Sequence, residues 1–305
     1  MNHTLRNRGI LLTIISTIGF STYPIFGKYV FSGGANLSTT LFVRFALAAL
    51  FFWIISHRLE GIPKLKAKLW ITLIIMGAIG YASMSGLYLL SVKFIPTSLA
   101  ALLLYTYPMI VAVLSVISKQ ETFSKYKITG LFICSAGLIL VLGLNLKGVN
   151  LMGILLAIGA SVTYSLYIVA ANFVLKEISP LLSSAVIASS AAVTYGLIGV
   201  ASGFTWHLSS TTWLGILGIA FFCSILAMLT FFYGVKLIGP TSASVISSLE
   251  PIMTIAFAAL FFQERLTLLQ SLGGILVILG GLVTVFNSEK PSPLRESTTQ
   301  PTYID

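Results

Sequence analysis

Long apolar runs separated by short polar connections make up most of the chain. Ten of these runs reach the length that a membrane-spanning helix needs, roughly 20 mostly apolar residues. They cover about residues 9–30, 37–56, 69–92, 96–118, 126–144, 151–175, 181–203, 211–235, 240–262 and 268–287. The connections are too short to hold a soluble domain. The pattern therefore predicts an all-α membrane protein with ten transmembrane helices.

The same pattern occurs twice along the chain. Gly-Ile-Leu-Leu opens the first run at Gly9 and the sixth at Gly153, and Gln-Glu at residues 120–121 returns at residues 263–264. Each copy holds five spans, an odd number, so the second copy must lie upside down relative to the first. Inverted repeats of this kind have their binding site at the membrane midplane, where the halves meet. We therefore predict two five-helix repeats, residues 1–148 and 149–287, around a central cavity.

Composition and charge agree with a membrane protein. The chain is 57% hydrophobic and 9% charged, whereas a soluble domain has about 25% charged residues. The net charge of +10 comes mostly from Lys and Arg in connections that fall on one side of the ten spans. This bias predicts a multi-pass protein of the cytoplasmic (inner) cell membrane with both termini in the cytoplasm. The basic balance then reflects topology and lipid contact rather than a nucleic-acid partner. Residues 288–305 are rich in Pro, Ser and Thr and are predicted to form a disordered cytoplasmic tail.

Each copy has the same closing pattern. Glutamate, eight residues, glycine, six residues and glycine follow one another from Glu121 and again from Glu264. The span before each pattern holds a proline in its middle, Pro108 and Pro251, and Glu250 precedes the second. Two five-helix halves with these marks resemble the drug/metabolite transporter superfamily, EamA-type branch, over roughly residues 9–287. The resemblance implies ten helices, a central cavity between the halves and transport by alternating access.

The candidate cavity residues are polar side chains on single faces of apolar helices. In the first and sixth spans hydroxyl groups recur four residues apart, and Tyr81, Ser85 and Tyr88 share one face of the third span. Helix packing or an aromatic belt at the membrane interface are the alternatives to a cavity wall. The predicted cavity residues are Thr17, Ser21, Tyr23, Arg44, Tyr81, Ser85, Tyr88, Tyr107, Ser161, Ser165, Tyr167, Ser247 and Glu250.

Glu250 is the single carboxylate deep within a predicted span. A charge at that depth costs about 2.5–3.5 kcal/mol, so it must be paired, hydrated or protonated. Ser247 and Thr254 share its helix face and could bond it. We interpret Glu250 as a candidate proton site, and a structural carboxylate at a helix break is the alternative. Arg44 could pair with Glu250, bind a substrate carboxylate or extend toward the membrane surface.

Four further residues are candidates for motion. Lys28 lies at the end of the first hydroxyl stripe and is a possible gate, or it extends to the membrane surface. Pro24, Pro108 and Pro251 interrupt spans one, four and nine and are candidate hinges, or simple bends. The Gly pattern near residues 273–281 indicates close helix packing, with a dimer face as a second use. The chain is thus expected to act as a monomer or a homodimer.

Motifs for nucleotide or metal chemistry do not occur in the sequence. We therefore predict no cofactor and no metal, and we do not expect an enzyme. The two cysteines fall in apolar spans and are predicted to be packing residues. The predicted function is secondary transport of a small amphipathic metabolite, an amino acid or related compound, in the export direction, with possible proton coupling. A channel or lipid scramblase is the alternative, and an intramembrane enzyme is a weaker one.

Overall fold

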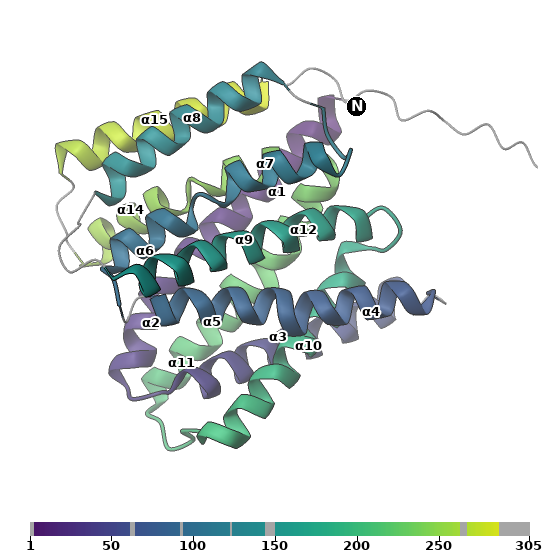
Figure 1. The fold of residues 1–305 in the computed structure, drawn as a ribbon. Helices are drawn as coiled ribbons and strands as arrows, with labels where there is room; N and C mark the ends of the chain where they lie inside the picture. Colours follow the sequence, from purple (N-terminus) through teal and green to yellow (C-terminus); the bar gives the residue numbers. More distant parts are fainter. Residues whose placement is uncertain are drawn as a thin grey trace, which may run out of the picture.

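The protein is described by a computed structural model over residues 3–61, 65–91, 94–122, 124–143, 150–262 and 267–286, and these residues contain helices and no strand. Figure 1 shows the helices stacked in a bundle. They are α1 (His3–Ser21), α2 (Tyr23–Ser32), α3 (Leu37–Leu59), α4 (Ala67–Ile75), the π-helix η1 (Met76–Tyr81), α5 (Ala82–Ser91), α6 (Thr97–Leu104), α7 (Tyr107–Ile117), α8 (Lys125–Leu142), α9 (Leu151–Val174), α10 (Pro180–Ser202), α11 (Ser210–Gly218), the π-helix η2 (Ile219–Leu226), α12 (Ala227–Ile238), α13 (Pro240–Ser247), α14 (Glu250–Phe262) and α15 (Leu268–Phe286).

Eight helical stretches of the described residues are long and apolar enough to cross a membrane. They are His3–Ser32, Leu37–Leu59, Ala67–Tyr88, Leu99–Ile117, Lys125–Leu142, Leu151–Val174, Pro180–Ser202 and Ser210–Ile238. The chain is therefore a multi-pass membrane protein, as its composition predicts. The predicted ninth span is divided between α13 and α14, and the apolar part of α15 is shorter than the other eight. The count of ten spans stays a prediction.

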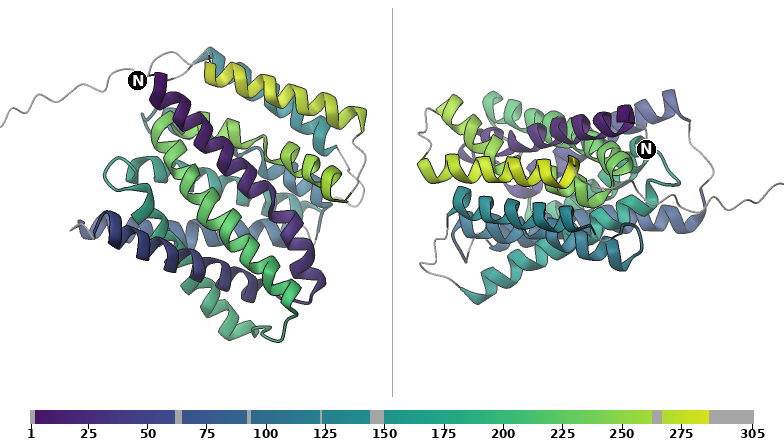
Figure 2. Two further views of the ribbon diagram at one scale, coloured as in Figure 1. Left: turned by 180° about the vertical axis from the view of Figure 1, so that it is seen from behind. Right: turned by 90° about the horizontal axis from the view of Figure 1, so that it is seen from above.

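Helices from the two predicted repeats pack against each other in pairs. α3 lies along α10, α1 along α12, α5 along α9 and α8 along α15 (Figures 1 and 2). α3 and α10 begin alike: Asn36 Oδ1 accepts the backbone N–H of Thr39 at 2.9 Å, and Ser179 Oγ accepts that of Leu182 at 3.1 Å. Such caps satisfy a backbone donor that a helix start leaves free. Because the two capping residues are 143 positions apart, the sequence repeat coincides with a repeat of local structure.

Glycines allow α8 and α15 to approach closely at one edge of the bundle (Figure 2). A Cβ atom on Gly137 would lie 2.7 Å from the Gly273 carbonyl oxygen, and one on Gly273 would lie 2.6 Å from that of Gly137. Gly280 has the same relation to the Gly130 carbonyl, at 2.6 Å. Real Cβ atoms do not approach so closely, so only glycine fits. The close packing predicted for Gly273 and Gly280 is confirmed.

The prolines predicted as span interruptions lie where one helix ends and another begins. Pro108 is the second residue of α7 and Pro251 the second residue of α14. Pro24 has the same place in α2, after the end of α1. Proline is tolerated in a first helical turn, because the N–H that it lacks has no partner there. The helix is therefore interrupted in the middle of the first, fourth and ninth predicted spans.

Two π-helices interrupt the third and eighth predicted spans. η1 begins at Met76 and η2 begins at Ile219, again 143 residues apart. A π-helix has a wider turn than an α-helix, and such segments occur frequently at functional sites. The repeat therefore includes a π-helix in each half. No proline or charged residue in these segments would have predicted it from the sequence.

The four tryptophans form two stacked pairs. The rings of Trp53 and Trp70 lie 6.5 Å apart at an angle of 16°, and Trp53 Nε1 donates to Ser189 Oγ at 2.9 Å. The rings of Trp206 and Trp213 also lie 6.5 Å apart, at 14°. The first pair joins α3 to α4 and the second joins the α10–α11 connection to α11. Each pair therefore lies at a different end of the bundle.

Candidate functional site

Glu250 lies at the break in the ninth predicted span. It is the first residue of α14, directly after the buried Ser248, and its own side chain is half-buried. The N-terminus of a helix favours a carboxylate, because unpaired N–H groups and the helix dipole face it. The Tyr105 hydroxyl donates a hydrogen bond to this carboxylate. The carboxylate thus has a defined neighbour from the break between α6 and α7.

Neither hydroxyl expected from helix spacing to bond Glu250 does so, and Ser247 Oγ has no hydrogen-bond partner in the described part of the chain. Thr254 Oγ1 donates to the Ser21 carbonyl oxygen at 3.3 Å, so it joins α14 to α1 instead. Ser247 is buried beside the Tyr107 hydroxyl, which lies 3.4 Å from the Ser244 carbonyl. The break before Glu250 separates it from Ser247 on α13. Thr254 shares α14 with Glu250, but its hydroxyl donates to α1.

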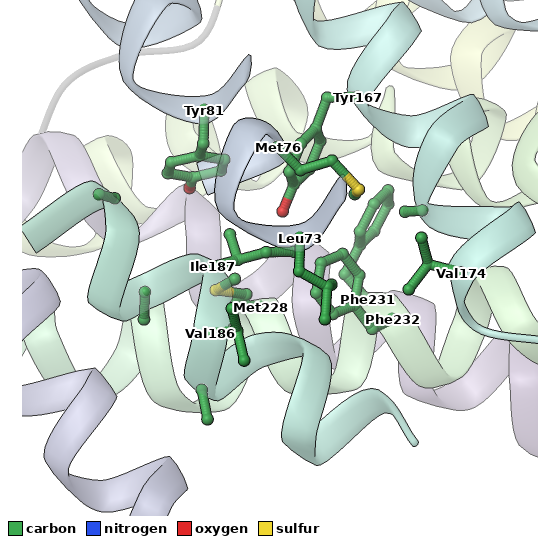
Figure 3. Close-up of a cluster of buried hydrophobic side chains, with 14 of the residues drawn as sticks. Leu73, Met76, Tyr81, Tyr167, Val174, Val186, Ile187, Met228, Phe231 and Phe232 are labelled. Atoms are coloured by element: carbon green, nitrogen blue, oxygen red, sulfur yellow. The ribbon is translucent and has the colours of Figure 1, made fainter. Parts of the chain in front are cut away.

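A continuous row of five tyrosine rings begins at this carboxylate. We call it the tyrosine row: Tyr105, Tyr107, Tyr164, Tyr167 and Tyr81. Successive ring centroids lie 6.2, 4.7, 6.1 and 5.4 Å apart, within the range of favourable aromatic contacts. Tyr81 and Tyr167 are labelled in Figure 3, where both point toward the same region between the helices. The row offers ring faces for an apolar solute and hydroxyl groups for a polar one.

Arg44 lies at the other end of the tyrosine row. Its side chain is 5% exposed, and its Nη2 lies 3.2 Å from the Tyr81 hydroxyl. Its Nε donates to Ser224 Oγ at 2.5 Å. Within the described part of the chain the one ion pair is Lys127–Glu121. Arg44 and Glu250 therefore form no ion pair here, and the burial of Arg44 excludes extension toward the membrane surface.

The predicted hydroxyl stripe of the sixth span faces the break between α6 and α7, whereas the stripe of the first span bonds its own helix. In the sixth predicted span Ser161 Oγ lies 3.0 Å from Thr106 Oγ1, and Ser165 Oγ lies 3.2 Å from the Tyr107 carbonyl oxygen. In the first span Thr17 donates to the Thr13 carbonyl at 2.9 Å. Thr17, Ser21, Ser161 and Ser165 are all fully buried or nearly so. In this conformation the hydroxyls of both stripes are buried and bonded within the protein.

The remaining predicted site residues lie around Arg44 and the third span. The Tyr23 ring lies 5.4 Å from the Arg44 guanidinium carbon. Ser85 Oγ donates to the Tyr81 carbonyl at 3.1 Å, and Tyr88 is half-buried. The side chains of Pro24 and Lys28 lie outside the described part of the structure, and so do Glu264 and residues 287–305. The gate and tail predictions for these residues thus stay predictions.

Several helix ends that carry a Lys or Arg meet at one end of the bundle, which we call the basic end. These residues are Arg8, Arg58, Lys66, Lys125 and Lys176. The helices of the bundle enclose between them a hydrophobic cluster, part of which Figure 3 shows and which includes Tyr81, Tyr107 and Tyr167 of the tyrosine row. The gap lined by Leu73, Met76, Ile187 and Phe232 has no room for a water molecule. A second hollow of about 400 Å³ opens on the outer surface between α3, α11 and η2, and apolar side chains line it. Neither hollow is lined by Glu250 or Arg44.

Sequence reasoning missed several residues of this region. Tyr105 and Tyr164 belong to the tyrosine row, and Ser224 bonds Arg44. Tyr195 is buried beside them, and its hydroxyl donates to the Ala82 carbonyl at 3.1 Å. Tyr105 had one usable signal, since it stands three residues before Pro108, where a span interruption was predicted. The other three have no signal beyond helical spacing.

The described residues hold no group of three His, Cys, Asp or Glu side chains that could bind a metal ion. Cys134 and Cys223 are buried free thiols. Cys223 Sγ lies 3.3 Å from the Gly19 carbonyl, a contact between η2 and α1. The two cysteines are packing residues, as predicted.

Comparison with known proteins gives the class of this molecule. Residues 7–143 and 151–286 each match the EamA-like transporter family. Two Bacillus subtilis proteins are similar along most of their length: uncharacterized transporter YyaM is 28% identical over 88% of this chain and 92% of its own, and uncharacterized transporter YcbK is 26% identical over 90% and 92%. An uncharacterized transporter from Archaeoglobus fulgidus is 25% identical over 88% and 93%. A solved crystal structure superposes with a TM-score of 0.80 over 91% of this chain and 96% of that one, at 17% identity, which shows the shared fold.

The fold and the matched family define a multi-pass membrane transporter. The chain belongs to the EamA-like transporter family, within the drug/metabolite transporter superfamily that its repeated pattern resembles.

Proposed function

We propose that this protein is a secondary transporter that exports a small amphipathic metabolite, an amino acid or a related compound, by alternating access. The observation that carries the proposal is a single intramembrane carboxylate, Glu250, at the break of a discontinuous helix and at one end of a row of tyrosines. Discontinuous membrane helices form the substrate and ion sites of many transporters. An intramembrane ionisable residue is a functional candidate by default.

The proposed architecture is ten spans in two inverted repeats, residues 1–148 and 149–287, around a central cavity. The double match to one family supports a repeat, and the helix pairs support a two-fold relation between the halves. The pair α1–α12 and the pair α9–α5 exchange under the 143- to 144-residue shift, and the pairs α3–α10 and α8–α15 each map onto themselves. Five spans in each half would then turn the second half upside down in the membrane.

We place the protein in the cytoplasmic membrane with the basic end in the cytoplasm. The bias of Lys and Arg toward one end supports this orientation. In that orientation the tightly packed gap lined by Leu73, Met76, Ile187 and Phe232 would close the path toward the cytoplasm. The conformation described would then be one that is closed to the cytoplasm.

Proton coupling through Glu250 is the proposed energy source. A carboxylate that can be neutral or charged in the membrane can exchange a proton as the site faces first one side and then the other. No second acidic side chain is deep within the described spans, so Glu250 would carry this exchange alone. The solute is taken to lie along the tyrosine row, whose rings and hydroxyls suit an amphipathic molecule.

Counterflow in proteoliposomes tests the transport proposal. Vesicles loaded with unlabelled L-phenylalanine should take up labelled L-phenylalanine transiently above equilibrium, and the rate should saturate with concentration, because a carrier exchanges one bound solute for another. Flux that rises linearly with concentration and shows no counterflow would instead identify a channel. Vesicles without protein are the control.

A further inference from the structure

We propose that Arg44 is the anchor for a carboxylate group of the transported solute, held in a polar clamp between the two π-helices. The inference rests on the proposed function and narrows it, since it names one chemical group that the solute must have. It depends on three observations: the contacts of Arg44, the lack of an acidic partner, and the residue at the equivalent position in the second half.

The two π-helices supply the polar contacts of Arg44. Tyr81, whose hydroxyl lies 3.2 Å from Nη2, is the last residue of η1. Ser224 and Cys223 belong to η2: Ser224 Oγ accepts from Nε at 2.5 Å, and the Cys223 carbonyl lies 3.5 Å from Nη2. The guanidinium is thus held where the distorted segments of the two halves meet. The ring of Phe45 flanks it, with 4.8 Å from the guanidinium carbon to the ring centroid.

The charge of Arg44 has no acidic partner in the described part of the chain. Its three hydrogen-bond partners are a hydroxyl, a phenol and a carbonyl, all neutral groups. A guanidinium has five N–H groups in a planar fork, and these contacts use three of them. A buried charge is costly unless an opposite charge compensates it. The two N–H groups of Nη1 remain, and a charge-assisted hydrogen bond from them to a carboxylate would compensate the charge.

The second half of the chain shows that packing alone does not require a charge here. The position 143 residues after Arg44 is Ile187, in the same turn of α10 as Arg44 is of α3. Ile187 is 1% exposed and packs on η1, where a Cβ atom on Gly77 would lie 2.9 Å from the Ile187 Cα atom. An apolar side chain therefore suffices to hold a helix against a π-helix. The arginine of the first half must have another purpose, and binding an anionic group fits its geometry.

The tyrosine row indicates the rest of the solute. It starts at Tyr81, which bonds Arg44, and ends at Tyr105, which bonds Glu250. A solute with its carboxylate on Arg44 would lay its apolar part on the rings of Tyr167 and Tyr164. The solute class is therefore an amphipathic carboxylic acid, of which an amino acid with an apolar side chain is one example.

Thermal unfolding of the purified protein tests the proposal with 3-phenylpropionate and its neutral amide, 3-phenylpropanamide. Binding to the folded state raises Tm, so the acid should raise the Tm of the wild type at concentrations at least tenfold lower than the amide. Arg44→Gln should lose this preference. Arg44→Lys, which keeps the charge, should retain the preference with weaker binding. Lys125→Gln, which removes an exposed positive charge at the basic end, should behave as the wild type does.

Two results would overturn the proposal. One is a wild type that responds equally to the acid and the amide, or to neither, and this result does not depend on whether any variant folds. The other is a preference for the acid that persists in Arg44→Gln, which would leave Arg44 as a structural clamp between the π-helices. Loss of L-phenylalanine counterflow with the acid preference intact would instead reject the proposed transport function and leave the carboxylate site in place.

Discussion

Glu250 can exist within the membrane because the surrounding backbone is broken. It is the first residue of α14, at the positive end of the helix dipole, and Tyr105 donates a hydrogen bond to it. Both interactions stabilise the charged form of the carboxylate, which the apolar surroundings of a membrane span would otherwise destabilise. A residue with this balance can change its protonation during a transport cycle, whereas a carboxylate in a fixed ion pair would stay charged.

Glu250→Gln should separate proton coupling from transport itself. Glutamine keeps the size of the side chain and a hydrogen-bond acceptor for Tyr105 but cannot exchange a proton. We expect solute accumulation driven by a pH gradient to be lost in proteoliposomes, while counterflow without a gradient is retained.

The matched control is Glu177→Gln, at an exposed carboxylate of the basic end. It should keep both activities. If Glu250→Gln accumulates solute in response to pH as well as the wild type does, Glu250 is not the coupling residue.

The sequence was sufficient to single out Glu250, Arg44, Tyr81, Tyr107 and Tyr167, because charge and aromatic rings are conspicuous in apolar spans. It was not sufficient for their neighbours. Helical periodicity says which residues share a face only while a helix is continuous, and the helices at residues 105–106 and 248–249 are not. This is why Tyr105 was missed as a partner of the carboxylate and why Ser247 was wrongly considered for it. Thr254 does share α14 with Glu250, but spacing along one helix could not show that α1 supplies the acceptor for its hydroxyl.

At the scale of helices, the pair α8–α15 depends on glycine. Gly137→Ala would bring a methyl group to 2.7 Å from a carbonyl oxygen of α15, so the helices must separate. Forced overpacking costs about 1–3 kcal/mol, and we expect a loss of this size in the free energy of unfolding measured in detergent. Gly281→Ala is the control on α15, because its methyl group would meet nothing within 4 Å. Equal stability of the two variants would contradict the close packing.

Sequence patterns predicted the helical elements unevenly. The prolines indicated all three breaks, since the ring of proline and its missing N–H limit where it fits in a helix. The π-helices η1 and η2 had no such signal, because a π-turn depends on how neighbouring helices pack and not on one residue type. Arg44 could be seen in the sequence, but its position between two π-helices could not.

At the scale of the whole molecule, the proposed inverted arrangement makes a prediction about sidedness. Ser32 ends α2, after the first predicted span, and Lys176 follows α9, the sixth. Both are exposed. In a background without the native cysteines, Ser32→Cys and Lys176→Cys should react with a membrane-impermeant thiol reagent from opposite sides of the membrane. Labelling of both from the same side would rule out inverted repeats.

Glu121 joins the two halves at the basic end. Its Oε1 accepts from the backbone N–H of Thr241 at the start of α13 at 3.3 Å, and its Oε2 accepts from Lys127 at 2.7 Å. Hydrogen bonds to a charged group contribute about 1.5–3 kcal/mol. Opening of the basic end would separate α7 from α13 and break the contact with Thr241. In the proposed alternating-access cycle, the contact between Glu121 and Thr241 would therefore favour the state that is closed at the basic end.

Glu121→Ala should shift the protein toward the open state. A shift of 1–3 kcal/mol changes the populations roughly 5- to 150-fold. Leu73 is fully buried in the hydrophobic cluster, so a Leu73→Cys reporter should become reactive toward a water-soluble thiol reagent at least fivefold faster when Glu121→Ala is added. Lys125→Ala, which changes an exposed residue nearby, should leave the rate unchanged. An unchanged rate in the Glu121→Ala background would mean that this contact does not hold the end closed.

The two tryptophan pairs allow each end of the protein to be followed by intrinsic fluorescence. One pair lies at each end of the bundle, and the four indoles are all the tryptophans of the chain. Replacing one pair by phenylalanine would leave fluorescence from the other end alone. Emission spectra and quenching by brominated phospholipids could then follow each face of the carrier separately, with no attached dye, while a solute is bound and released.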